Sequence, residues 1–251
     1  MNDLYPETFA RFYDLIYHQQ RDSVDHDFFL NEIRQTRGKI LEVGVGTGRL
    51  FTEALKFGAD AYGIDISRPM LDVLHTKLDK DQQHRISQQN ILDFHFDDQF
   101  DLIIAPFRVF MHLLEKDEQL RALNHVFRYL NPGGKFIFDV FIPDLKQLIT
   151  GIDHHTDFEA EYKPGNKISR TVSTKSDLLN QRIHITFHME WEENHERKKE
   201  DWKFQLRFFF RYELEHLVER SDFSEYRILG NYLGNELDEK SKDFIVLCEK
   251  T

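Results

Sequence analysis

Between residues 39 and 141, short apolar runs alternate with amphipathic stretches. An apolar run of about four to eight residues is typical of a buried strand, and apolar positions three or four apart indicate a helix. The expected strands cover residues 39–46, 60–67, 85–91, 100–106 and 135–141. Because strands that alternate with helices lie parallel, this pattern predicts a doubly wound α/β core with helices on both faces of its sheet.

The connecting segments carry their apolar residues on one face. Residues 48–58 form the first expected helix, and Ser67 is a suitable cap for the second. A later helix ends at residues 131–134, an Asn-Pro-Gly-Gly sequence that breaks helices. The core-facing residues expected on these helices are Leu50, Phe51, Ala54 and Leu55, then Met70, Leu71, Leu74 and Leu78, and finally Leu120, Leu123, Phe127 and Leu130.

The segments on either side of this core have a different pattern. Residues 1–37 have apolar residues at helical spacing, whereas 158–211 alternate or are β-branched and aromatic, which is typical of two to four antiparallel strands. A length of 251 residues suits one large domain. We therefore expect a single domain over 1–251, with an N-terminal helical segment, a core of 38–157 and 212–251, and an inserted antiparallel β-sheet at 158–211.

Charge and composition exclude several classes of protein. With 33 basic and 44 acidic residues the net charge is −11, which repels phosphate backbones and argues against a nucleic-acid partner. No run of about 18 apolar residues suggests a membrane span, and the N-terminus lacks the order of a secretory signal. Cys248 is the single cysteine, and the histidines lack metal-site spacing. We expect a cytoplasmic protein without a metal or a membrane.

Three glycines follow the first buried strand at alternate positions, Gly44, Gly46 and Gly48. Such a loop lets the backbone turn tightly and approach a ligand at the carboxyl edge of a parallel sheet. A dinucleotide site needs the spacing G-x-G-x-x-G, and here the third glycine comes one residue early. Glu42, two residues before the loop, suits a ligand with a cationic amino group better than a diphosphate.

Asp65 ends the second strand, 19 residues after Gly46. A carboxylate at this place can accept both hydroxyl groups of a ribose. This residue alone does not separate a nicotinamide dinucleotide from another adenosine ligand.

Four tracts together resemble the class I S-adenosylmethionine-dependent methyltransferases. They are residues 41–48 (LEVGVGTG), 63–71 (GIDISRPML), 90–94 (NILDF) with Phe100-Asp101, and 130–134 (LNPGG). The resemblance runs along the whole chain and implies a doubly wound, Rossmann-like sheet of seven strands, the last of them antiparallel. It also implies S-adenosyl-L-methionine as the cofactor and, from residues 12–17 (FYDLIY), a lid helix like that of small-molecule members such as amino-sugar N-methyltransferases.

The resemblance assigns roles to particular residues. The expected cofactor-binding residues are Tyr13, Arg21, Glu42, Gly44, Gly46, Gly48, Asp65, Ile66, Met70, Asn90, Ile91, Ala105 and Phe107. Glu42 and Gly44 would hold the methionine part, Asp65 the ribose, and Arg21 the cofactor carboxylate. Ile66, Met70, Asn90 and Ile91 would surround the adenine, although the family more often has aspartate at the position of Asn90. Tyr13, with Tyr17 as second choice, would close over the sulfonium, and Ala105 and Phe107 would line the path of the methyl group.

Methyl transfer from a sulfonium is an in-line displacement that needs mainly alignment, with a base only when the acceptor arrives protonated. Tyr13 and His112 are the expected catalytic residues, and the expected acceptor is a nitrogen or oxygen of a small molecule. The aromatic face of 158–211 needs cover, and we expect it to roof the acceptor site and to form a homodimer. An NAD(P)-linked oxidoreductase and a non-catalytic S-adenosylmethionine-binding protein are the alternatives.

Overall fold

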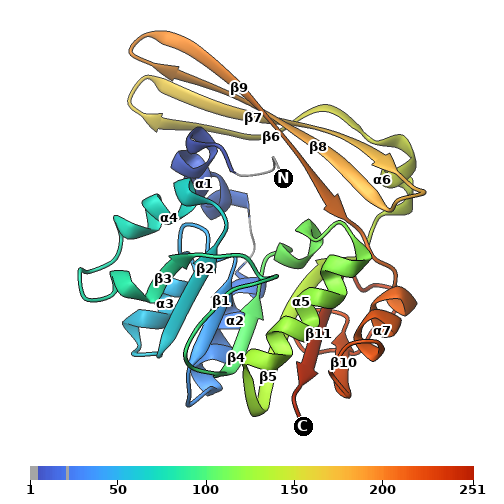
Figure 1. The fold of residues 1–251 in the computed structure, drawn as a ribbon. Helices are drawn as coiled ribbons and strands as arrows, with labels where there is room; N and C mark the ends of the chain where they lie inside the picture. The colour runs from blue at the N-terminus through green and yellow to red at the C-terminus, as the bar shows by residue number, and fades with distance from the viewer. Residues whose placement is uncertain (1–4, 21–22) are drawn as a thin grey trace.

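A computed structural model describes residues 5–20 and 23–251 of the chain and contains two β-sheets (Figure 1). The first sheet has seven strands in the order β10-β11-β5-β4-β1-β2-β3. They are β1 (Ile40–Val43), β2 (Ala61–Asp65), β3 (Ile86–Gln88), β4 (Phe100–Ala105), β5 (Leu130–Phe141), β10 (Glu225–Leu229) and β11 (Asp243–Glu249). The second sheet has four strands, β6 (Ile152–Lys163), β7 (Asn166–Asp177), β8 (Arg182–Glu193) and β9 (Glu196–Arg207).

The strand order of the first sheet reverses at its centre, the place where open α/β sheets have a crevice, and we refer to this place as the crevice. β1 pairs in parallel with both β2 and β4, so the chain runs outward on one side to β3 and then returns to the other side of β1. β11 is antiparallel to β5 and to β10. In open α/β sheets a ligand binds at the carboxyl edge where the strand order reverses. Here the strand order reverses at β1, so the expected binding place lies between the loops that follow β1 and β4.

Seven α-helices and two 3-10 helices complete the described chain. They are α1 (Glu7–Gln20), α2 (Val24–Gln35), α3 (Phe51–Lys56), α4 (Arg68–His75), η1 (Gln83–Arg85), η2 (Val109–His112), α5 (Lys116–Tyr129), α6 (Leu145–Thr150) and α7 (Arg211–Glu219). α4 begins as its sequence predicts, because the Ser67 hydroxyl accepts a hydrogen bond from the Met70 N–H at 3.4 Å. Within the described residues, no helix is long and apolar enough to cross a membrane.

Apolar side chains cover both faces of the seven-stranded sheet. Along β5, Phe136, Phe138 and Val140 belong to one buried cluster and Ile137 to the other, as the alternation of a strand requires. The first cluster continues into α1, α5, α7 and the second sheet, and the other into α2, α3 and α4. A sheet with both faces buried is typical of a doubly wound α/β fold.

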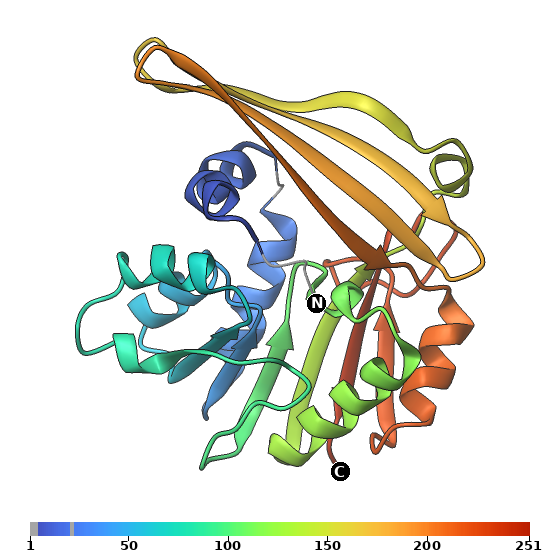
Figure 2. The ribbon, with the colours of Figure 1, turned by 45° about the horizontal axis from the view of Figure 1, so that its top comes forward.

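The second sheet lies across one end of the first, with α1 between them (Figures 1 and 2). Phe9 of α1 stacks on Phe187 with ring centroids 5.7 Å apart and lies 4.5 Å from Trp202. Phe12 lies 6.1 Å from Trp191. The aromatic face of the inserted sheet is therefore covered within one chain, by the N-terminal helix.

The expected fold is confirmed, including the antiparallel strand near the C-terminus and the inserted sheet. The second sheet occupies 152–207, whereas the expected insertion covers 158–211. One prediction about packing is wrong, because Leu120 of α5 is only partly buried and belongs to neither apolar cluster, whereas Phe127 is partly buried but packs against the core as expected. The residues that α5 buries are Gln119, Ala122, Leu123 and Val126. Gln119 is polar but buried because its side-chain amide donates to the Leu113 carbonyl at 2.8 Å, a partner that the helical pattern does not reveal.

We expect Phe9→Ala to lower the free energy of unfolding by about 3–5 kcal/mol, because it removes a fully buried ring from the contact between α1 and the second sheet. Urea denaturation measures the loss. Leu179→Ala, at a position that is 90% exposed, is the control and should change stability by no more than about 0.5 kcal/mol. Similar losses for the two variants would contradict the packing described here.

Candidate functional site

The glycine loop after β1 lies at the crevice. Gly44, Gly46 and Gly48 have φ values of 71°, 54° and 79°, a region that favours glycine. At Gly44 there is also no room for a side chain, because a Cβ would lie 2.4 Å from a methyl group of Val109. The loop therefore needs glycine both for its backbone shape and for close contact with the segment that follows β4.

Asp65, at the end of β2, is fixed next to this loop. Its carboxylate accepts hydrogen bonds from the N–H of Gly46 at 2.8 Å and from the N–H of Ser67 at 2.7 Å. Burial raises the pKa of Asp65, and these N–H groups oppose the rise. A carboxylate oxygen can accept more than one hydrogen bond, so both oxygens can still receive ligand hydroxyl groups.

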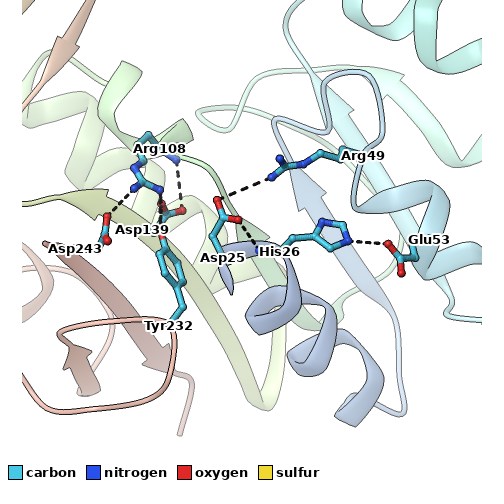
Figure 3. Close-up of polar contacts among 8 residues, drawn as sticks. All are labelled: Asp25, His26, Arg49, Glu53, Arg108, Asp139, Tyr232 and Asp243. Carbon is cyan, nitrogen blue, oxygen red and sulfur yellow. Dashed lines mark hydrogen bonds and ion pairs between the residues drawn. The ribbon is translucent and has the colours of Figure 1, made fainter. Parts of the chain in front are cut away.

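Glu42 of β1 is a buried carboxyl group whose Oε2 atom has no hydrogen-bond partner in the described part of the chain. Burial raises its pKa well above the usual range, and nearby Arg49 partly opposes the rise. Arg49 lies over the Phe107 ring at 4.1 Å and 4.0 Å from the Asp25 carboxylate (Figure 3). A buried carboxylate is costly unless it is paired, so Glu42 is suited to a cationic group of a ligand.

The residues expected around an adenine lie in the segments that follow β2 and β3. Ile66 follows Asp65 directly and is 43% exposed, whereas Met70 and Ile91 are buried beneath this surface. The Asn90 side-chain oxygen accepts a hydrogen bond from the Leu92 N–H at 3.0 Å, which fixes its orientation. The exposed apolar surface of Ile66 beside a fixed carboxylate would fit a flat ring attached to a ribose.

α1 is tied to the glycine loop through Asp14. The Thr47 hydroxyl donates to Asp14 at 2.6 Å, and the Lys77 ammonium donates to Asp14 at 2.5 Å and to the Thr47 carbonyl at 2.8 Å. The rings of Tyr13 and Tyr17 lie 4.4 Å apart on the same helix. The expected lid helix thus contacts the loop directly. Arg21 lies outside the described residues.

The segment after β4 carries the remaining candidates. Ala105 ends the strand and is fully buried, and Phe107 packs under Arg49. His112, in η2, lies with its ring centroid 6.1 Å from Phe204 of the second sheet and 6.4 Å from Tyr5. Burial lowers the pKa of His112 to about 4. At neutral pH this histidine is therefore uncharged, and its affinity for a proton is low.

Several residues of the site have no recognisable signal in the sequence. Asp14, Thr47 and Lys77 form one group, and a second group surrounds Arg108 with Asp139, Tyr232 and Asp243 (Figure 3). Their members are separated by about 30 to 135 residues. Periodicity reports only local neighbours, so it does not find such contacts. In the described residues, no group of three or more histidine, cysteine or acidic side chains could hold a metal ion.

Comparison with known proteins identifies the class of domain. Residues 40–134 match the family described as a methyltransferase domain. An uncharacterized methyltransferase of Bacillus mycoides is 34% identical over 134 residues, which are 53% of this chain and 55% of the relative. The chain thus aligns with about half the length of the curated relatives it matches.

Solved structures show the same fold over nearly the whole chain. The CcbJ methyltransferase from Streptomyces caelestis superposes with a TM-score of 0.78 at 20% identity and covers 100% of this chain and 97% of its own. CalS10, a S-adenosylmethionine-bound amino pentose methyltransferase from Micromonospora echinaspora, gives 0.72 at 16% identity, with 100% of both chains covered. The expected resemblance is confirmed for the domain and for the fold.

Asp14→Ala and Thr47→Val test the connection between α1 and the glycine loop. Because the two side chains share a hydrogen bond, the double variant should lose less unfolding free energy than the sum of the single variants, by about 0.5–3 kcal/mol. Urea denaturation of the four proteins measures this coupling. The exposed pair Arg68 and Asp72, tested in the same way, should show about 0.5 kcal/mol or less. Additive losses at Asp14 and Thr47 would exclude the connection.

The pKa of His112 predicts an acid-dependent loss of stability. In the unfolded chain His112 binds a proton near pH 6.5, whereas in the folded chain it does so only near pH 4. The stability that the neutral ring contributes is therefore fully present above pH 6.5 and is lost as the pH falls toward 4. Between pH 7 and pH 4 the wild type should lose about 2–3 kcal/mol more unfolding free energy than His112→Phe, because phenylalanine cannot titrate. Denaturation at pH 4, 5, 6 and 7 measures it. Parallel pH profiles of the two proteins would show that His112 has an ordinary pKa.

Proposed function

We propose that this protein is a S-adenosylmethionine-dependent methyltransferase that acts on nitrogen or oxygen of a small molecule. The observation that carries the proposal is the pair of buried carboxylates at the glycine loop. Glu42 has an oxygen without a partner in the described chain, and Asp65 is held in place by two backbone N–H groups. The matched methyltransferase domain and the fold of the CcbJ and CalS10 structures support it.

The two carboxyl groups at the glycine loop fit the ammonium group and the ribose of this cofactor. Glu42 would bind its ammonium group beside Gly44, and Asp65 would accept hydrogen bonds from the ribose hydroxyl groups. Ile66 and Met70 would pack against the adenine, next to Asn90 and Ile91. When bound, the cofactor supplies a methyl group already activated by a positively charged sulfur. Gly46 and Gly48 give the loop its left-handed backbone, and Arg21 would pair with the cofactor carboxylate.

On the acceptor side, the second sheet and the segment after β4 would form the walls of the site. Tyr13 would lie near the methyl group, and Ala105 and Phe107 would line its path. His112 is uncharged at physiological pH and is the proposed base for an acceptor that arrives protonated, but burial lowers its pKa to about 4 and makes it a weak base until a bound acceptor changes its surroundings. CalS10 is named as an amino pentose methyltransferase, which supports a small acceptor here as well. The net charge of −11 supports the exclusion of nucleic acids.

We also propose a cytoplasmic location and a homodimer formed through the inserted sheet. Because α1 covers the aromatic face of this sheet, a dimer would have to use the opposite face or an edge strand. That opposite face carries polar side chains, among them Thr171, Ser173, His188 and Asp201. Light scattering coupled to gel filtration distinguishes a monomer from a dimer.

Binding measurements separate this function from its alternatives. Calorimetry should show micromolar binding of S-adenosylhomocysteine and none of NADH, whereas an NAD(P)-linked oxidoreductase would give the reverse. A protein that binds S-adenosylhomocysteine but transfers no methyl group to any member of an amine, sugar and phenol panel would instead be a non-catalytic binder.

Asp65→Ala should weaken the binding of S-adenosylhomocysteine by about 1.5–3 kcal/mol, the scale for hydrogen bonds to a charged group. Calorimetry measures the change. Asp72→Ala removes a carboxylate from the exposed side of α4, where it pairs with Arg68, and should leave the affinity unchanged. If Asp65→Ala binds as tightly as the wild type, the ribose assignment is wrong.

A further inference from the structure

Two consecutive residues after β4 have a backbone conformation that side chains disfavour. Phe107 and Arg108 have φ values of 61° and 72°. In this left-handed region the Cβ atom lies too close to the following carbonyl oxygen, so residues other than glycine seldom adopt it. Such a conformation persists only where the surrounding structure enforces it, and it concentrates at functional sites.

The Arg108 side chain supplies the enforcing contacts (Figure 3). Its guanidinium group donates to the carboxylates of Asp139 and Asp243 and to the Tyr232 hydroxyl, at 2.6, 2.6 and 2.7 Å. The Tyr232 hydroxyl in turn donates to Asp139 at 2.9 Å. We refer to these four residues as the Arg108 clamp. Guanidinium suits it because its planar group donates in several fixed directions at once.

The opposite charges of the Arg108 clamp stabilise one another. Asp139 is completely buried in β5, and Asp243 begins β11. Burial alone would lower the pKa of Arg108, but Asp139, Tyr232 and Asp243 raise it above its ordinary value, so the side chain stays charged. Removing one partner of a buried ion pair leaves the other uncompensated, which is costly. The clamp therefore fixes the strained segment to strands on the far side of the crevice from β2.

The strained segment contacts both halves of the site. Phe107 lies under Arg49, and the positive charge of Arg49 acts on the Glu42 carboxyl group. The Val109 side chain occupies the space that a side chain at position 44 would need. His112 comes three residues later, in η2. A shift of this backbone would therefore move the wall of the glycine loop and the histidine on the acceptor side together.

We propose that Arg108 is a positioning residue that holds the segment 107–112 in its binding conformation through its backbone, without touching cofactor or acceptor. The proposal rests on the proposed function, since it concerns the site for S-adenosylmethionine. A direct role of the guanidinium group in binding the ligand is the alternative, and substitutions at Arg108 distinguish the two.

Arg108→Ala and Arg108→Gly both remove the clamp, but only glycine adopts the left-handed conformation without cost. If Arg108 acts through the backbone, Arg108→Ala should bind S-adenosylhomocysteine at least about tenfold more weakly than the wild type, and Arg108→Gly should recover roughly fivefold or more of that loss. Calorimetry measures both affinities. Thermal unfolding gives the midpoint of each variant, so that binding is measured at a temperature at which both are folded. Arg108→Gly should also unfold at a higher temperature than Arg108→Ala, although glycine ordinarily destabilises a chain.

Arg85→Ala is the matched control. Arg85 pairs with Asp60 at 2.6 Å and has the same side-chain exposure as Arg108, 25%, but its guanidinium group contacts Asp60, the Ala61 carbonyl and the Tyr62 ring at the start of β2. Its affinity for S-adenosylhomocysteine should equal that of the wild type. Equal losses for Arg108→Ala and Arg108→Gly would show direct contact with the ligand, and unchanged affinity in Arg108→Ala would show no role; either result overturns the proposal. Failure of the wild type to bind would instead overturn the proposed function.

Discussion

The packing of α1 between the two sheets is the interaction on which the rest of this structure depends. Phe9 and Phe12 cover the aromatic face of the inserted sheet, and on the same helix Asp14 receives the hydrogen bond of Thr47. Apolar burial is not directional, so it brings the helix to the sheet, and the short polar contact then fixes its position relative to the glycine loop. Without α1, an apolar sheet would face water directly above the crevice.

The crevice itself is defined by buried charge. Glu42 and Asp65 are carboxylates at the ends of neighbouring strands, and burial raises the pKa of both. Asp65 is compensated by backbone N–H groups, whereas Glu42 has an oxygen left without a partner in the described chain. Opposite them, Arg108 is fully engaged by acidic neighbours. The site thus combines a carboxylate fixed by backbone N–H groups, a buried carboxyl group with an unpartnered oxygen, and an arginine held by its acidic neighbours.

Local sequence predicted the parts of this site that depend on neighbours along the chain. The glycine loop, Asp65 and the Ser67 cap each lie at the end of a buried strand or just after it, so strand periodicity and glycine spacing are sufficient to find them. The buried face of α5 was predicted incorrectly, since Gln119 is buried in place of Leu120. Helical spacing favours the larger apolar side chain, but the carbonyl of Leu113 decides which side chain is satisfied inside.

The amino-acid sequence by itself determined the order of strands and helices, the glycine loop and the residue types suited to an adenosine ligand, because each of these follows from periodicity or from the freedom of a single residue. Only the tertiary structure decided that α1 covers the inserted sheet, that Asp14 meets Thr47, and that Arg108 is held by Asp139 and Asp243. These contacts join residues from about 30 to about 190 positions apart. They form because the strand order brings distant loops to one edge of the sheet, which no local pattern encodes.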